Sequence, residues 1–270
     1  MWLPWEYGLL LAATFALIGW RVASHPSRIS ALAREATIIS ILYSMWQFAG
    51  QLSVLGVDDA IARGEWLWDL QRTLRFPSEL ALQDAVLPSS FWTQFSNLYY
   101  AIVHVPAMGV FLIWLFLRNR ALYLTWRNAL ALVTGVSLVI QLIPVAPPRL
   151  TPATGMIDTG LQYGQSVYGA LGYGIAGQLQ ALPSIHVAWA AVIGWGVWEA
   201  STSRWRWVGP AHFAITFLVV AITGNHYWAD GLLAMVLLVG ARWLGERIAT
   251  VFTKSDLEQA EPVAQPVPLS

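Results

Sequence analysis

The sequence predicts an all-α, polytopic membrane protein, a helical bundle of about seven spans. Hydrophobic residues make up 57% of its 270 residues and charged residues only 11%. A soluble domain of this length carries about 25% charged residues. Apolar segments of near-spanning length recur along the chain. Tryptophan is abundant, with 16 residues, as expected where indole rings gather at membrane interfaces.

Seven apolar segments account for the predicted spans, because a spanning helix needs roughly 20 mainly apolar residues. The N-terminus lacks the basic region of a secretory signal, so the first segment is interpreted as a retained span. We expect a single integral-membrane domain, 1–252, with its motif-bearing core at 97–248, and a polar, proline-punctuated, disordered cytoplasmic tail, 253–270. The spans fall at 5–22, 37–56, 97–117, 128–146, 184–199, 207–224 and 228–248.

The segment 57–96 is not a span, because its charges are mostly acidic. Trp66, Leu70 and Leu74 recur every four residues, a pattern typical of an amphipathic helix lying in the membrane interface. Phe76-Pro77 ends that helix, and Ser78 can cap a second short one. We interpret the segment as a surface ledge on the outer face of the bundle. Guidance of a lipid substrate is the alternative.

The third and fourth spans each contribute a polar residue. His104 lies within the third span, where an ionisable group usually faces the bundle interior; it either supports a site or simply bonds to a neighbouring helix. Prolines end the fourth span and hold the following chain extended, which delivers Arg149 to the outer rim. A guanidinium is a planar fork of donors, which favours a phosphate ligand over a lipid-headgroup anchor.

Residues 150–181 form a long outer loop rich in glycine, in which Asp158 is the only charge. A loop of this length is usually a functional lid or disordered. Flexible backbone beside tyrosines favours a lid that closes over an apolar substrate. The tyrosines are Tyr163, Tyr168 and Tyr173.

Two histidine clusters lie at the far ends of consecutive apolar runs. Leu182-Pro183-Ser184-Ile185-His186 opens the first run, and Gly224-Asn225-His226-Tyr227-Trp228-Ala229-Asp230 closes the second. A basic hairpin, 203–206, joins the runs. An up-and-back pair of helices therefore brings both clusters to one membrane face, at the water boundary.

The basic residues orient this bundle. One side holds most of them, which makes that side cytoplasmic by the positive-inside rule. The N-terminus and the histidine clusters then face a periplasm, the exterior or a lumen. The first side holds Arg21, Arg28, Arg34, Arg118, Arg120, Arg127, Arg204, Arg206, Arg242, Arg247 and Lys254; the other holds Arg63, Arg72, Arg75 and Arg149.

The clusters contain the parts of a phosphoryl-transfer site. His226 and Asp230 are four apart and share a helix face. The carboxylate can accept one imidazole N–H and leave the other nitrogen nucleophilic. Pro183-Ser184 indicates a helix start, whose free N–H groups bind anions. With Arg149, these groups suit transfer through a phosphohistidine, with His186 as acid and base.

Two alternatives stay open at this stage. Two histidines and a carboxylate match an iron-type facial triad, but Arg149 and an anion-binding helix end are poor neighbours for a cation. The histidines can also simply bond to water at the membrane boundary. We expect no metal and no cofactor. The net charge of zero gives no indication of nucleic acid, and the absence of cysteine excludes a thiolate site.

Three short blocks carry a family resemblance: Pro147-Pro148-Arg149, then Pro183-Ser184-Ile185-His186, then Gly224-Asn225-His226-Tyr227 with Asp230. Their order resembles the signature of the phosphatidic acid phosphatase type 2 superfamily. More closely it resembles the inositol-phosphoryltransferase branch, which includes inositol phosphorylceramide synthases. The match covers about residues 97–245. It implies a six-helix core, with one helix extra here, acting on a membrane lipid substrate.

The resemblance also implies roles. It makes His226 the nucleophile, Asp230 the group that orients it, and His186 the general acid. Ser184 and Arg149 would bind phosphate oxygens. Substrate binding is also expected for the block residues Asn225 and Tyr227, and for His104, whose Tyr-x-x-x-His setting resembles the same branch.

The chain departs from the phosphatase pattern at two cations. That pattern has a lysine well before the first-block arginine, where residues 138–142 have none, and an arginine six residues before the third-block histidine, where Val220 stands. A cation-poor site suits a singly charged diester better than a monoester. We therefore favour headgroup transfer between lipids. The alternatives are a lipid phosphate monoester phosphatase and a non-catalytic lipid-binding protein.

Overall fold

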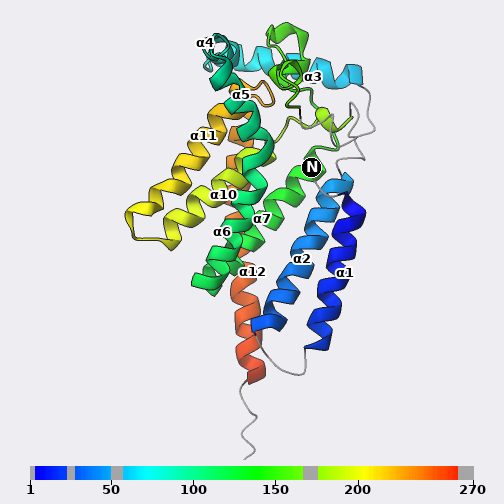
Figure 1. Ribbon diagram of the computed structural model, residues 1–270, viewed down its shortest axis with the longest axis vertical. Helices are drawn as coiled ribbons and strands as arrows, with labels where there is room; N and C mark the ends of the chain where they lie inside the picture. Colours follow the sequence, from blue (N-terminus) through cyan, green and yellow to red (C-terminus); the bar gives the residue numbers. More distant parts are fainter. Residues whose placement is uncertain (1–3, 23–27, 50–56, 167–175, 261–270) are drawn as a thin grey trace, which may run out of the picture.

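The computed structural model describes residues 4–22, 28–49, 57–166 and 176–260, and these residues form a helical bundle without β-strands (Figure 1). The predicted all-α membrane fold is confirmed. The long helices of this described part are α1 (Trp5–Arg21), α2 (Arg28–Ala49), α6 (His104–Arg118), α7 (Arg120–Ile140), α10 (Ile185–Ala200), α11 (Val208–Ile222) and α12 (Trp228–Ala260).

Within the described residues, four helical stretches are long and apolar enough to cross a membrane. In the first, α5 (Ser90–Leu98), a π-helical turn (Tyr99–Val103) and α6 follow one another without a break. These stretches indicate an integral membrane protein. They are Ser90–Arg118, Arg120–Ile140, Arg204–Ile222 and Trp228–Arg247.

Two of the predicted spans begin too late. α2 starts at Arg28 and α7 at Arg120, several residues before the predicted 37 and 128. Glu35 on α2 is buried, and its carboxylate accepts hydrogen bonds from Arg120 and Arg127 on α7, at 3.1 and 2.5 Å. These charges therefore lie inside the helix pair, because each neutralises the other, whereas the sequence pattern places them in loops.

The hairpin of α10 and α11 brings the two histidine clusters to the same end of the bundle. A Cβ atom on Gly209 of α11 would lie 2.9 Å from the carbonyl oxygen of Gly194 on α10. Only glycine allows the two backbones to approach so closely. The hairpin shares one buried core with α6, α7 and α12. This core includes Leu115, Trp126, Val192, Val219 and Leu238.

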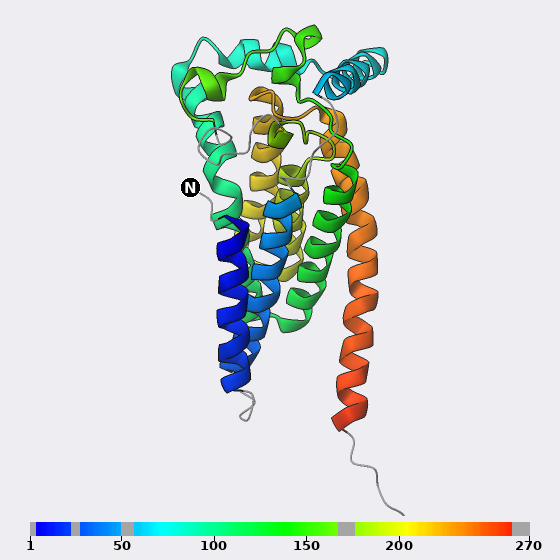
Figure 2. The same ribbon diagram turned by 90° about the vertical axis from the view of Figure 1, so that its right-hand side faces the viewer.

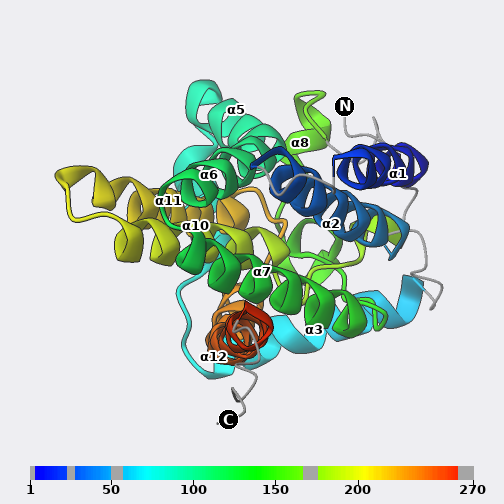
Figure 3. The same ribbon diagram turned by 90° about the horizontal axis from the view of Figure 1, so that it is seen from below.

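Short helices cover the upper end of the bundle in Figure 1, and in the view from below α3 runs along one side of the bundle, past α12 and α7 (Figure 3). α3 (Val57–Thr73) exposes Trp66 and Leu74, as predicted for an interfacial amphipathic helix. Ser78 caps α4 (Glu79–Val86), also as predicted, by accepting a hydrogen bond from the Ala81 N–H.

The ledge also caps the helix that carries Asp230. Glu79 accepts a hydrogen bond from the Trp228 N–H at 3.1 Å, and Gln71 accepts one from the Ala229 N–H at 2.9 Å. Both side chains are buried. They satisfy free N–H groups at the start of α12, so the ledge fixes where that helix begins.

α12 extends below the rest of the bundle (Figure 2) and continues to Ala260. The first residues of the segment 253–270, for which the sequence predicts a disordered tail, are therefore helical. Residues 253–260 contain good helix formers such as Leu257, Glu258 and Gln259, and the first proline comes only at Pro262. Residues 261–270 lie outside the described part.

Candidate active site

His226 lies in the turn between α11 and α12, with its ring held through Nδ1. Nδ1 is 2.8 Å from the carbonyl oxygen of Ala181 and 3.4 Å from Oδ2 of Asp230. Both neighbours are acceptors, so Nδ1 carries the proton and Nε2 carries the lone pair. The predicted Asp230 contact is present, but the closer partner is a backbone carbonyl.

Asp230 is fully buried at the start of α12 and performs two structural tasks there. Its Oδ2 accepts a hydrogen bond from the Tyr227 N–H at 2.8 Å, which fixes the turn that carries His226. Its backbone carbonyl accepts one from the Ser184 N–H at 3.2 Å. Asp230 therefore connects the turn before α12 to the start of α10.

His186 lies in the first turn of α10, as predicted from Pro183-Ser184. Ser184 is the N-cap residue, and its Oγ accepts a hydrogen bond from the Val187 N–H at 3.3 Å. The ring centroids of His186 and His226 are 5.6 Å apart. The two clusters that the up-and-back helix pair was expected to unite do meet.

Arg149 lies in a short 3-10 helix, Pro148–Leu150, and is buried rather than exposed on a rim. Its backbone N–H donates to the carbonyl of Gly224 at 2.9 Å. Its Nε donates to Oδ1 of Asn225 at 2.8 Å. These bonds attach the first block directly to the third. Gly224 has φ +64°, and a Cβ there would lie 3.3 Å from the Arg149 nitrogen, so the turn requires glycine.

The Nη1 atom of Arg149 meets two residues of the long loop. It lies 2.6 Å from Oδ2 of Asp158, in an ion pair, and donates to Oε1 of Gln178 at 3.1 Å. Neither contact could be predicted from the sequence, where Asp158 is notable only as the single charge of that loop. The loop tyrosines Tyr168 and Tyr173 lie outside the described residues.

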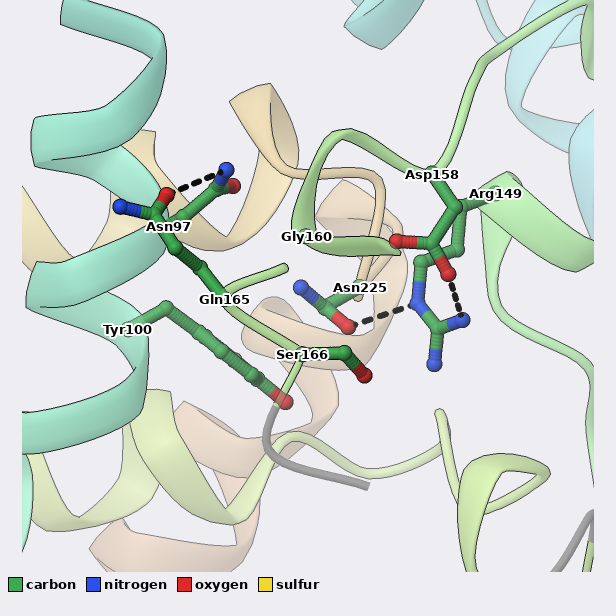
Figure 4. Close-up of a pocket in the computed structure, with 8 residues that line it drawn as sticks. All are labelled: Asn97, Tyr100, Arg149, Asp158, Gly160, Gln165, Ser166 and Asn225. Carbon is green, nitrogen blue, oxygen red and sulfur yellow. Dashed lines mark hydrogen bonds and ion pairs between the residues drawn. The ribbon is translucent and has the colours of Figure 1, made fainter. Parts of the chain in front are cut away.

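A polar pocket lies between Tyr100 and Arg149 (Figure 4). Tyr100, which lines it, has its ring 4.3 Å from the His186 ring and 6.4 Å from the His226 ring. In Figure 4 the guanidinium of Arg149 is held by Asn225 and Asp158 at the opposite wall. The lining comprises Asn97, Tyr100, Arg149, Asp158, Gly160, Gln165, Ser166 and Asn225. Arg149 and Asp158 are the charged members.

Of the predicted site residues, Arg149 and Asn225 line this pocket; the others, His226, His186, Asp230, Ser184, Tyr227 and His104, do not. Ser184 is fully buried at its helix cap. Tyr227 is also buried and bonds to the hydroxyl of Thr151 at 2.9 Å; burial raises the pKa of the Tyr227 hydroxyl, which stays protonated. His104 has its Nδ1 3.2 Å from the Tyr100 carbonyl and its ring 4.9 Å from the His186 ring. His104 thus lies behind His186, within the bundle.

A metal centre has no counterpart in the described part of the chain, which contains no group of three or more histidine, aspartate or glutamate side chains arranged to hold an ion. The facial-triad alternative therefore gains no support from the geometry.

The comparison with family models places residues 65–244, more than half of the chain, in a match to the model described as PAP2 superfamily. This range contains all three blocks together with the second half of α3 and all of α4 and α5. No curated protein and no solved structure matches the chain.

Proposed function

The chain belongs to the PAP2 superfamily, and we propose that it is a membrane lipid phosphotransferase with His226 as its nucleophile. Membership indicates lipid phosphatase or phosphotransferase chemistry. The observation that carries the proposal is the meeting of three distant blocks: the His186 and His226 rings are 5.6 Å apart, and Arg149 bonds to Asn225, the residue next to His226.

In the first half-reaction, Nε2 of His226 attacks the phosphorus of a phosphodiester lipid. A nitrogen–phosphorus bond forms, and the bond from phosphorus to the lipid oxygen breaks. His186 donates a proton to that oxygen, so a lipid alcohol leaves and the phospho-headgroup stays on His226. Arg149 stabilises the phosphoryl oxygens as charge develops on them.

In the second half-reaction, the hydroxyl of an acceptor lipid gives its proton to His186 and attacks the phosphorus. The nitrogen–phosphorus bond breaks, which regenerates His226 and yields a new phosphodiester. Asp230 and the Ala181 carbonyl support both halves, because they stabilise the proton on Nδ1 while Nε2 bonds to phosphorus.

The low positive charge of the site supports a diester substrate. Val220, where the phosphatase pattern has an arginine, is buried in the apolar core. We propose transfer of a headgroup such as inositol phosphate, supported by the resemblance of the blocks and of His104 to the inositol-phosphoryltransferase branch.

Purified protein incubated with a phosphodiester phospholipid and a lipid alcohol acceptor is expected to form a new phosphodiester, detected by lipid mass spectrometry. Release of inorganic phosphate from a lipid monophosphate, without any transfer, would instead identify a phosphatase. The acceptor-free reaction is the control, because a transferase slows when no hydroxyl acceptor is supplied.

We also propose that the site faces the periplasm, the cell exterior or a lumen, since most basic residues lie toward the other ends of the helices, among them Arg118, Arg204 and Arg247. A topology reporter inserted after Gly160 is expected to report an outside location, and one after Ser203 an inside location. The first insertion point lies within a four-residue helix, Thr159–Gln162, and the second precedes a short 3-10 helix, Arg204–Trp207, so both avoid the long core helices. The reverse pattern would overturn the orientation and place the C-terminus outside.

A further inference from the structure

We propose that Asp158 determines the charge of the substrate that the phosphate site accepts. Its carboxylate neutralises Arg149 and thereby favours singly charged phosphodiesters over doubly charged phosphate monoesters. The inference rests on the proposed function, which it deepens by assigning a substrate-selecting residue.

Both oxygens of Asp158 are engaged in the structure. Oδ2 lies 2.6 Å from Nη1 of Arg149. Oδ1 accepts a hydrogen bond from the Leu161 N–H at 2.8 Å and so caps the short helix α8 (Thr159–Gln162). The side chain is 18% exposed and that of Arg149 2%. Water therefore screens this ion pair less than a pair on an open surface.

Buried side chains of α4 and α5 hold the loop on each side of Asp158. Gln83 of α4 is 1% exposed; its Oε1 accepts from the Ile157 N–H at 2.9 Å, and its Nε2 donates to the Ile157 carbonyl at 3.1 Å. Asn97 of α5 accepts a hydrogen bond from the Thr159 hydroxyl at 2.8 Å. Residues far away in the sequence therefore fix the backbone on both sides of Asp158 and hold its carboxylate against Arg149.

The charge balance of the pocket gives the selection its physical basis. Arg149 and Asp158 are the two charged residues of the lining, and the others are neutral side chains and a glycine. A diester brings one negative charge, which Arg149 and neutral donors can meet. A monoester dianion brings a second charge and meets the Asp158 carboxylate, which repels it in a partly desolvated site.

The substitution Asp158→Asn tests this mechanism, because it removes the charge and keeps the shape. Asparagine is also a good N-cap, so α8 keeps its bond to the Leu161 N–H. We expect the variant to bind inorganic phosphate on the order of 10-fold more tightly than the wild type. Binding of dimethyl phosphate, a singly charged diester, is expected to change far less.

The measurement is a ³¹P NMR titration of the detergent-solubilised full chain with each anion, at a pH above the second ionisation of phosphate. Asp69→Asn, which removes an exposed carboxylate from α3, is the matched control and should change neither affinity. Asp158→Ser retains a capping oxygen without the charge and provides the same comparison if the asparagine variant folds poorly.

Three outcomes would overturn the inference. If the variant binds both anions equally more weakly, Asp158 only positions Arg149. If it binds both equally more tightly, the carboxylate acts through a general field effect. If neither affinity changes, Asp158 does not contact the bound anion. These results are independent of turnover. A wild-type protein that transfers no headgroup would contradict the proposed function, while the titration would still decide whether Asp158 selects by charge.

Discussion

The variant His226→Asn is expected to lower turnover on the order of 10³-fold or more without unfolding the protein. An asparagine amide can place an N–H where Nδ1 of the imidazole lies and keep the bond to the Ala181 carbonyl, which is 2.8 Å long in the wild type. It has no atom at the position of Nε2. The substitution therefore removes the proposed nucleophile and preserves the local hydrogen bond.

Two readouts distinguish lost chemistry from lost structure. A donor lipid labelled with ³²P in its headgroup phosphate should leave an alkali-stable, acid-labile label on the wild-type chain and none on His226→Asn. The size-exclusion profile of the variant should match that of the wild type.

The control is His212→Asn. His212 belongs to the same group of rings, 5.8 Å from His104, but has no assigned role in the reaction. Its Nδ1 lies 2.6 Å from the Tyr99 hydroxyl, and the asparagine amide keeps a partner there. This variant should retain most of its activity. Unchanged turnover in His226→Asn would instead favour a different nucleophile or a lipid-binding protein without catalysis.

The parts of the site that the sequence predicted are those governed by local rules. Pro183-Ser184 predicts the start of α10, and the spacing of two apolar runs predicts a hairpin that returns to the same end. These two facts alone place His186 near His226, since a helix pair has few other arrangements. The rings are 5.6 Å apart because those local rules hold.

The parts that the sequence did not predict depend on contacts between distant segments. Asp158 meets Arg149 because Gln83, 74 positions before Ile157, holds the loop in place. No periodicity marks such a bond. The closest partner of His226 is the carbonyl of Ala181, a backbone atom that every residue type carries. This carbonyl becomes a partner of His226 only because the fold places residue 181 next to the His226 ring.

The charged ends of α2 and α7 were misassigned to loops for a related reason. Arginine and glutamate normally indicate the end of a span. Here Glu35 and Arg127 pair at 2.5 Å inside the bundle, and Tyr123 donates a third hydrogen bond to the same carboxylate at 3.0 Å. A charged residue that is paired between two helices does not indicate the end of a span. Such a pair is visible only in the three-dimensional structure, because its members are far apart in the sequence.

The second large effect is expected at Arg149, where we expect that lysine cannot perform the function of arginine. The guanidinium meets Asn225 through Nε and Asp158 through Nη1, at 2.8 and 2.6 Å, so its plane is fixed by two partners at once. A lysine ammonium is a single point charge on a flexible stem and cannot satisfy both directions. Since Arg149 is proposed to stabilise developing charge on phosphoryl oxygens, Arg149→Lys is expected to reduce kcat/KM on the order of 10²-fold.

The matched control for this charge-conserving change is Arg72→Lys. Arg72 also pairs with a carboxylate near the same end of the bundle, Glu79 at 3.0 Å, but does not line the pocket. It should retain activity within a few-fold of the wild type. The two variants carry the same net charge, so a difference between them isolates the geometry of Arg149 from any effect of overall electrostatics. Equal activity of both would mean that position 149 contributes only a positive charge, and the fork geometry proposed for phosphate recognition would be wrong.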